Sequence, residues 1–491
     1  MISSGGPITK DNTGVEYYAT IFAAEESPYE KGLLWCGSDD GLIHVSRNGG
    51  EEWTNVTPKK LPEWTMINSI EVDPFEKGGL YVAASRYKLG DYQPYLYHTT
   101  DYGQSWEMIV EGIPDGHFTR AIRADRKVKG LLYCGTEFGM YISTNNGANW
   151  QSFQLNLPKV PITDLALKDN DLIVATQGRS FWVLDDLNIV WDEVSELTKK
   201  DELRLFSVHP TVGYGGGKES SLTAGTNHPV GVQVFFNLPE TKEEVKLKFM
   251  DDQGEVIRIF STKAKDENDQ FKVKKGMNTF NWDTRYEKAD EFEGLLMWWG
   301  TLNGPKAPPG NYTARLVTES DSAETAIAIL LDPRIEGSAK DRQAQFDFLL
   351  EVRNKVDETH DAIRHMRTVK KQITDLSSRL DSTTHANVIA EGKRLDSLML
   401  DIEKVLYQTK LKSNQDMLNY PIRLNNKLAH VASLASMGIY APTKQMIGVK
   451  DDLTAKIDIE LAKWYAIRDQ DLKKYNALIR ESEVDMIGVG E

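Results

Sequence analysis

An eight-residue pattern occurs three times in the early part of the chain and constrains its fold more than any other feature. Each copy reads Ser/Thr, any residue, Asp/Asn, any residue, Gly, two further residues and Trp, and the copies span Ser46–Trp53, Thr99–Trp106 and Ser143–Trp150. A short Asp or Asn side chain accepts hydrogen bonds from nearby backbone amides, while Gly adopts a backbone conformation closed to other residues. The pattern therefore predicts a tight hairpin turn, after which the Trp opens a strand and buries its ring. The residues predicted to be structural are Ser46, Asn48, Gly50, Trp53, Thr99, Asp101, Gly103, Trp106, Ser143, Asn145, Gly147 and Trp150.

The repeat extends beyond the turns. Each copy follows a strand pair that begins at Lys31, Lys77 or Lys129, and these lysines are 46 and 52 residues apart. A fourth, degenerate unit lacks the turn motif. Four short strands per unit at this period is the signature of propeller blades, so we predict a partial β-propeller of about four blades. The other predicted strands are 17–24, 67–72 and 119–124, and in the fourth unit 162–167, 171–176 and 180–184.

The pattern changes after the blades. Residues 210–227 are rich in Gly and Ser and predict a linker. Alternating strands separated by turns then predict an immunoglobulin-like β-sandwich. Beyond Pro333, apolar residues recur at heptad spacing, and Ser338 with Asp341 predicts a capped first helix of an antiparallel helical bundle. The predicted domains are blades over 1–205, a linker over 206–228, a sandwich over 229–334 and a bundle over 335–491.

Composition narrows the classes of partner and cofactor. A net charge of −15 disfavours nucleic acid and anionic membranes, and no run approaches the roughly 20 apolar residues of a membrane span. The first residues lack the features of a signal peptide. Cys36 and Cys134 occupy the same strand position in different blades, which predicts two buried free thiols. We expect no cofactor and no metal, because His44, His98 and His117 show no metal-ligand spacing.

The turn motifs resemble Asp-box (bacterial neuraminidase) repeats. The run from Gly5–Thr9 through Gly178–Asp186 resembles bacterial propeller proteins related to the sortilin N-terminal domain, many of which are labelled glycosyl hydrolases. The resemblance implies an extracytoplasmic, longer protein with more blades upstream, of which this chain is similar to the C-terminal half. We therefore expect the isolated chain to self-associate or to need the upstream propeller half as a partner, because an open propeller exposes strand edges and apolar faces.

Catalytic carboxylates are hard to assign from the sequence. A glycosidase needs two carboxylates that face each other across a cleft. The candidates are the neighbours Asp39 and Asp40, the pair Glu71 and Asp73, and the pair 185–186, yet adjacent residues on a strand point to opposite faces. Turn chemistry or solvation is the favoured interpretation of all of them, and the Arg-Ile-Pro motif of sialidases is absent.

Several arginines suggest a binding face instead. Arg86, Arg120, Arg123 and Arg179 can line one propeller face and grip acidic sugars or peptide carboxylates, although pairing with the excess acidic residues is favoured. The candidate ligand-binding residues are Asp39, Asp40, Arg86, Arg120 and Arg179.

Two functions remain open at this stage. The first is a recognition scaffold that binds a protein, peptide or glycan through its propeller loops. The alternative is a xyloglucanase-like glycoside hydrolase whose catalytic carboxylates lie partly or wholly in upstream blades. We favour recognition, because no acid/base pair can be defended and a shared propeller says little about chemistry.

Overall fold

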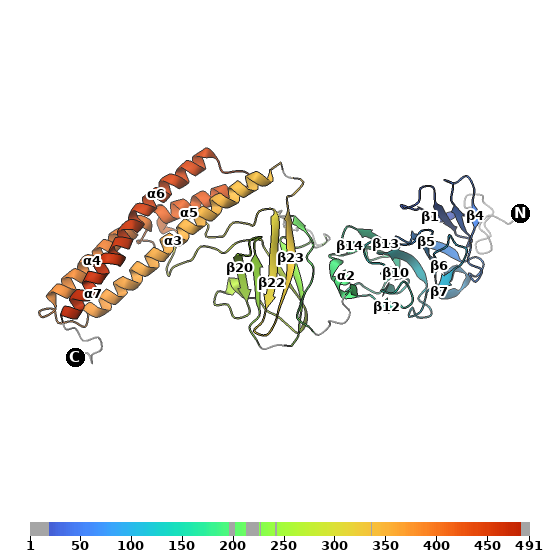
Figure 1. The fold of residues 1–491 in the computed structure, drawn as a ribbon, viewed down its shortest axis with the longest axis horizontal. Helices are drawn as coiled ribbons and strands as arrows, with labels where there is room; N and C mark the ends of the chain where they lie inside the picture. Colours follow the sequence, from blue (N-terminus) through green and yellow to red (C-terminus); the bar gives the residue numbers. More distant parts are fainter. Residues whose placement is uncertain are drawn as a thin grey trace. The chain divides into compact units, whose positions relative to one another are not determined.

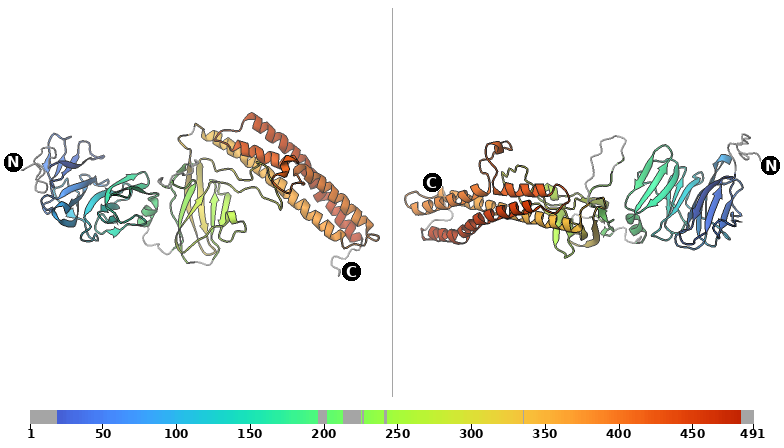
Figure 2. Two further views of the ribbon diagram at one scale, coloured as in Figure 1. Left: turned by 180° about the vertical axis from the view of Figure 1, so that it is seen from behind. Right: turned by 90° about the horizontal axis from the view of Figure 1, so that it is seen from above.

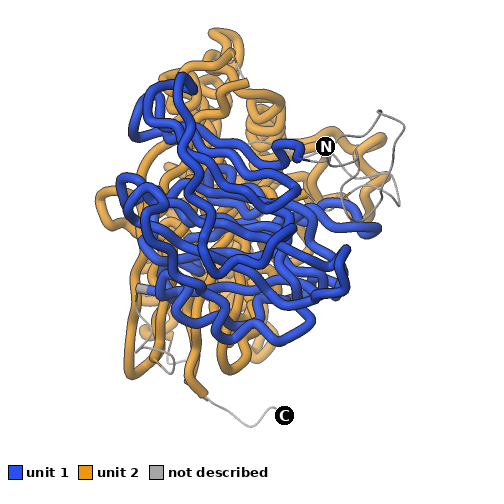
Figure 3. The backbone as a smooth tube through the Cα atoms, turned by 90° about the vertical axis from the view of Figure 1, so that its right-hand side faces the viewer, with its two compact units in different colours: residues 1–199 blue, residues 200–491 orange. Residues whose placement is uncertain are grey.

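A computed structural model describes residues 19–195, 202–212, 225, 227–240, 243–334 and 336–482. The chain forms two compact units, residues 1–199 and residues 200–491, which Figure 3 colours separately. Each unit is described by itself below.

The first unit consists of consecutive antiparallel sheets in which each strand pairs with the next strand of the chain. Three sheets have four strands and the last has three, so the predicted blades are confirmed. The first predicted strand, 17–24, is observed at Ile21–Glu26, and residues 17 and 18 lie outside the described part. The blades comprise β1 (Ile21–Glu26), β2 (Leu34–Ser38), β3 (Ile43–Ser46) and β4 (Thr54–Asn55); β5 (Met66–Val72), β6 (Leu80–Arg86), β7 (Asp91–Thr99) and β8 (Glu107–Met108); β9 (Thr119–Ala124), β10 (Leu132–Thr136), β11 (Gly139–Ser143) and β12 (Gln151–Ser152); and β13 (Ile162–Lys168), β14 (Asp171–Thr176) and β15 (Phe181–Leu184).

Apolar residues between successive blades form the core of this unit. Trp35 and Ile67 share a core between the first two blades, and a Cβ atom on Gly37 would lie only 2.4 Å from Ile67 Cγ2. The small residue therefore permits close approach of the sheets. Figure 1 shows β1 and β14 at opposite ends of the unit, so the described blades form an open row. The helix α2 (Asn188–Ser195) follows β15 in the chain.

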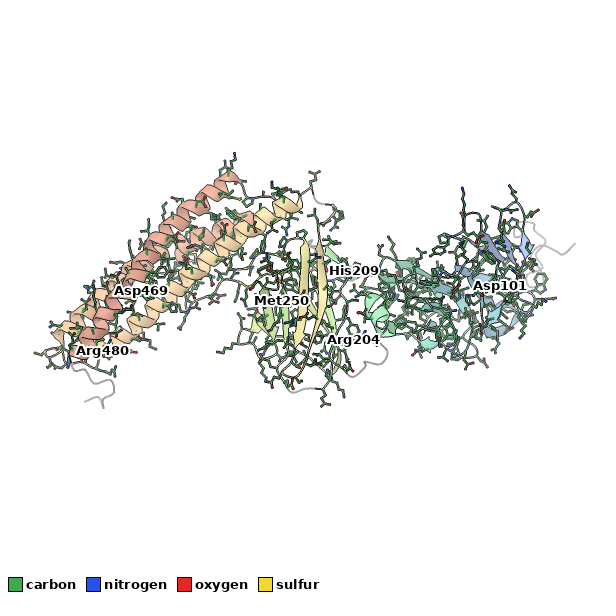
Figure 4. All side chains as sticks on the ribbon, viewed as in Figure 1. Asp101, Arg204, His209, Met250, Asp469 and Arg480 are labelled. Carbon is green, nitrogen blue, oxygen red and sulfur yellow. The ribbon has the colours of Figure 1, made fainter. Side chains whose placement is uncertain are left out.

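The turn motifs form the hydrogen bonds that the sequence predicts. The Ser46 hydroxyl accepts a hydrogen bond from the Gly50 amide at 2.9 Å, and the Asn48 side chain accepts one from the Glu52 amide at 2.9 Å. Gly50 has a φ of 94°. Figure 4 labels Asp101 of the second motif among the blades. The equivalent hydrogen bonds join Gly103 to Thr99, Ser105 to Asp101, Gly147 to Ser143 and Asn149 to Asn145.

The tryptophans of the motifs are not equally buried, so the expectation of three buried rings is wrong for the first. Trp150 is 2% exposed and donates from Nε1 to the Ile109 carbonyl at 2.7 Å, and Trp106 donates to the Val56 carbonyl at 2.7 Å. Both carbonyls belong to the segment that follows the preceding blade. Trp53 is 44% exposed and donates to Gly50 of its own turn.

The second unit begins with two sheets that share one apolar core, which contains Val234, Phe249 and Trp282. One sheet has the order β16-β18-β21 and the other β17-β23-β22-β19-β20. Its assignment to the immunoglobulin-like class stays a prediction. The strands are β16 (Arg204–Leu205), β17 (Thr211–Val212), β18 (Val232–Leu238), β19 (Lys246–Met250), β20 (Val256–Ser261), β21 (Gly276–Trp282), β22 (Gly310–Val317) and β23 (Ser322–Leu330).

The boundary between blades and sandwich lies earlier than the predicted 205/206. β16 pairs with β18 and β17 pairs with β23, so residues 204–212 belong to the second unit, where Figure 4 labels Arg204 and His209. Strands of two residues carry no alternating pattern, which is why the sequence assigned them to the blades and the linker. Residues 213–224 of the predicted linker lie outside the described residues.

Helices complete the second unit, as predicted, and Figure 2 shows the long ones side by side. Ser338 and Asp341 form the predicted reciprocal cap of α3. The Thr443 hydroxyl accepts a hydrogen bond from the Met446 amide and so caps the start of α6. A π-turn over Ile467–Asp471 divides it from α7. The helices are α3 (Ala339–Ser377), α4 (Ala386–Leu406), α5 (Leu424–Ala435), α6 (Lys444–Ala466) and α7 (Leu472–Glu481).

Cys36 and Cys134 are free thiols; Cys134 is buried and Cys36 is partly exposed. Among the described residues, no helix combines the length and apolar character that a membrane crossing needs.

Candidate functional site

The alternating strand directions place two sets of loops at the same end of the blades, which we call the loop face. One set joins the second and third strands of each blade, and the other leads into the next blade. Arg86 connects the two sets, because its Nε donates to the Glu63 carbonyl at 3.0 Å. The turn motifs lie at the opposite end. The loops of the loop face are 39–42, 87–90, 137–138 and 177–180, together with 56–65, 109–118 and 153–161.

Aromatic rings gather on the loop face at the second and third blades. The rings of Tyr87 and Phe118 stack with centroids 5.0 Å apart, and the ring of Tyr92 lies 6.1 Å from that of Phe118. The guanidinium of Arg120 lies 5.2 Å from the Phe118 ring centroid and is held by Glu137, whose Oε2 is 2.7 Å from Arg120 Nε. This arrangement fixes a cation beside a cluster of rings.

A second aromatic group continues the surface. Nδ1 of His117 lies 2.8 Å from the hydroxyl oxygen of Tyr141, and the imidazole ring lies 4.9 Å from the ring of Phe138. Burial lowers the pKa of His117, and the charge of Lys159 lowers it further. The imidazole is therefore neutral at pH 7, which suits a packing and hydrogen-bonding role.

The five candidate ligand-binding residues all fall on the loop face or at its edge. Arg86 is 3.5 Å from Asp91, and Arg120 is paired with Glu137, so both arginines have internal acidic partners. The Arg179 guanidinium donates to the Gly178 carbonyl within its own loop at 3.0 Å. Of these, only Arg120 contributes to the aromatic cluster.

The two loop carboxylates serve the local backbone. Asp39 accepts a hydrogen bond from the Thr20 amide at 2.9 Å and lines a small hollow with Trp64 and Arg86. Asp40 accepts a hydrogen bond from the Ser38 hydroxyl. The two do not face each other across a cleft. Asp73 likewise accepts hydrogen bonds from the Phe75 amide and the Tyr81 hydroxyl, both at 2.9 Å, and so fixes a turn.

A separate polar cluster lies on the first strands of the blades, and we call it the inner-strand cluster. Arg123 of β9 donates from Nη2 to Asp164 of β13 at 2.8 Å, and its Nε lies 3.6 Å from Glu71 of β5. Glu25 of β1 accepts a hydrogen bond from the Val72 amide at 2.9 Å. One guanidinium thus connects the second, third and fourth blades, and Glu25 extends the cluster to the first blade.

The carboxyl groups of this cluster have unusual protonation equilibria. Burial raises the pKa of the Glu71 carboxyl to about 7, against the attraction of Arg123 and with the repulsion of Glu25. Burial also raises the pKa of Glu25. A carboxyl group with a pKa near 7 can exchange a proton at neutral pH.

The sequence singled out Glu71 and Arg123 separately but missed that they meet, and it missed Glu25 and Asp164. A signal was present. Glu25, Glu71 and Arg123 are separated by the same 46 and 52 residues as the repeated lysines, so they occupy equivalent positions in successive blades. Within the described ranges, no group of three or more His, Cys, Asp or Glu side chains is arranged to hold a metal ion.

No protein-family model matches the chain, and no curated protein matches it. Among solved structures it is similar to YCF48 bound to D1 peptide, with 22% identity and a TM-score of 0.28 over 34% of this chain and 52% of that chain. It is also similar to YCF48 from Cyanidioschyzon merolae, with 16% identity and a TM-score of 0.27 over 34% and 53% of the two chains. The matched part therefore spans about half of each YCF48 chain.

A third similar structure is the GH74 xyloglucanase from Xanthomonas campestris, with 18% identity and a TM-score of 0.27 over 34% of this chain and 29% of that chain. The blades are established by the sheets and the contacts described above.

Proposed function

We propose that the blades form a recognition module whose loop face binds a protein or peptide segment. The observation that carries the proposal is the exposed aromatic cluster beside a fixed cation. Tyr92 and Phe138 are 54% and 51% exposed, and Glu137 holds Arg120 in place. Aromatic residues and Arg supply most of the binding energy at protein interfaces, and a side chain that is already ordered loses less entropy on binding.

We favour a peptide over a glycan, because aromatic side chains and Arg together are the residues that dominate binding at protein interfaces. We also propose an extracytoplasmic location, because the run from Gly5–Thr9 through Gly178–Asp186 resembles extracytoplasmic bacterial propeller proteins.

A random peptide library and a glycan array, both probed with the full chain, test the recognition proposal. We expect the library to yield binding peptides whose affinity falls about tenfold or more with either Tyr92→Ala or Phe138→Ala. Phe75→Ala is the matched control, because Phe75 is 39% exposed in the loop at the opposite end of the second blade. Peptide binding that survives both loop-face substitutions, or binding of glycans alone, would contradict the proposal.

Glycoside hydrolysis is the second candidate, and Glu25 and Glu71 are the observation that favours it. A carboxyl group with a pKa of about 7 near a second carboxyl group is the arrangement of a general acid and its partner. Glu71 is, however, only 8% exposed, so a substrate has little access to it. We expect no release of reducing sugar from xyloglucan or sialosides. Release that is abolished by Glu71→Gln would establish the hydrolase instead.

A further inference from the structure

The second unit contains a cleft of about 1040 Å³ between the segment that leads from β21 to β22, the first turns of α3 and the end of α5. Its described lining residues include five cationic side chains and a single carboxylate, Asp332, although the whole chain carries a net charge of −15. The concentration of positive charge therefore runs against the composition of the protein. The cationic residues are Arg285, Lys306, Arg334, Arg342 and Arg353.

The one lining carboxylate, Asp332, is already paired with Arg334. Arg334 grips Asp332 with two hydrogen bonds, from Nε to Oδ1 at 2.8 Å and from Nη2 to Oδ2 at 2.7 Å. This bidentate geometry is the strongest that a carboxylate and a guanidinium form. Asp332 consequently neutralises Arg334 and supplies no charge to the other four cations.

Three of those four cations form no ion pair among the described residues, and the fourth, Arg285, has a longer ion pair with Asp283. Arg342 donates to the side-chain oxygen of Gln345 at 2.6 Å, and Arg285 donates to the Gly304 carbonyl at 3.0 Å. Nε of Arg285 is 3.7 Å from the exposed carboxylate of Asp283. Among the described residues, Lys306 and Arg353 form no ion pair.

Two of these side chains, Arg353 and Lys306, are destabilised by burial or by the neighbouring positive charges. Nε of Arg353 is buried and has no hydrogen-bond partner among the described residues. Burial lowers the pKa of Lys306, and the charges of Arg285 and Arg342 lower it further against the attraction of Asp283. A buried donor and a cation surrounded by cations are both stabilised by an anion.

Part of the cleft wall is apolar. Phe346 and Val352 of α3 are buried residues that line it, together with Leu302, Leu349 and Ala432. A volume of this size is sufficient for a small organic molecule. The cationic and the apolar lining residues together fit a ligand with a negatively charged end and an apolar body.

We propose that this cleft binds an organic oxyanion, a phosphate- or carboxylate-bearing small molecule with an apolar portion. The planar guanidinium groups of Arg342 and Arg353 match the oxygens of either group, and Lys306 adds a point charge. The site is independent of the function proposed for the blades, because all of its residues belong to the second unit.

Isothermal titration calorimetry of the full chain at low ionic strength tests this proposal with three probes: inorganic pyrophosphate, octyl phosphate and octanoate. We expect at least one amphiphilic probe to bind more tightly than pyrophosphate, because it also contacts the apolar wall. Tighter binding of octyl phosphate identifies phosphate as the preferred group, and tighter binding of octanoate identifies carboxylate.

Lys306→Met and Arg353→Met each remove a charge and keep much of the side-chain length. We expect either variant to weaken binding about tenfold or more, as the loss of a charged hydrogen bond implies. Because each cation is unbalanced, we also expect Lys306→Met to unfold at the same temperature as the wild type or higher without ligand. Arg394→Met is the control, since Arg394 pairs with Glu391 on α4.

Three results would overturn the proposal. The first is that no probe binds the wild type at millimolar concentration. The second is binding that neither cleft substitution weakens. The third is equal weakening by Arg394→Met, which would indicate attraction to charge in general.

Discussion

Equivalent positions in successive blades share a sequence but not an environment. Trp53, Trp106 and Trp150 close the same turn motif, yet Trp53 is 44% exposed and Trp150 is 2% exposed. The difference lies in what each indole reaches. Trp150 and Trp106 bond to the segment that follows the preceding blade, whereas Trp53 bonds within its own turn. The repeat therefore encodes the turn, and the neighbouring blade decides how much that turn stabilises the unit.

The largest expected effect tests this difference directly. Trp150→Ala should lower the free energy of unfolding of the blades by about 3–5 kcal/mol, because it opens a cavity and removes the hydrogen bond to Ile109. Trp106→Ala should cost less, since its ring is half-buried, and Trp53→Ala about 1 kcal/mol or less. Urea denaturation with hydrogen exchange of blade peptides measures all three. Equal losses in the three variants would show that the neighbouring blade contributes nothing.

The second comparison concerns Glu25, Glu71 and Arg123, which also occupy equivalent positions. Burial raises the pKa of Glu71 from its ordinary value of 4.5 to about 7, so the folded protein keeps a proton that the unfolded chain releases. Its contribution to stability is therefore full below pH 4.5 and falls as pH rises to about 7. Glu71→Gln should stabilise the blades at pH 8 by up to about 3 kcal/mol and have little effect at pH 4.5.

Chemical denaturation at the two pH values checks this prediction. Glu26→Gln is a suitable control, because Glu26 is an exposed acid of the same strand as Glu25. A loss of stability at pH 8 in Glu71→Gln would show that the ion pair with Arg123 outweighs the cost of burial.

Sequence reasoning succeeded where contacts are local. The hydrogen bonds of Ser46 and Asn48 close within eight residues, so the motif alone predicts them. The pattern predicts a buried ring for both Trp53 and Trp150, but only Trp150 is buried. The pattern contains no information on the preceding blade, which decides this difference. The two-residue strands β16 and β17 escaped detection for lack of any alternation.

The candidate sites were less predictable, because their residues meet only through packing. Arg120 was identified as a surface cation, but its position beside Phe118 depends on how two loops fold. The cationic cleft is lined both by Lys306, which precedes β22, and by Arg353 of α3. No regular spacing in the sequence links Lys306 with Arg353, so the sequence does not predict that they share a cleft. Glu25 and Glu71, in contrast, are separated by the repeat period and could have been found from it.

The smallest expected effect is the one that should not differ between blades. The side chains of Asn48 and Asn145 each accept a backbone hydrogen bond at 2.9 Å inside their own turn. Asn48→Ala and Asn145→Ala should therefore each cost about 1 kcal/mol, the net value of one such bond. Urea denaturation of the two variants, measured beside the Trp series, checks this equality. If Asn145→Ala costs several times more than Asn48→Ala, the stability of the turn depends on the preceding blade. The hydrogen bonds inside the turn would then not be a property that the copies of the repeat share.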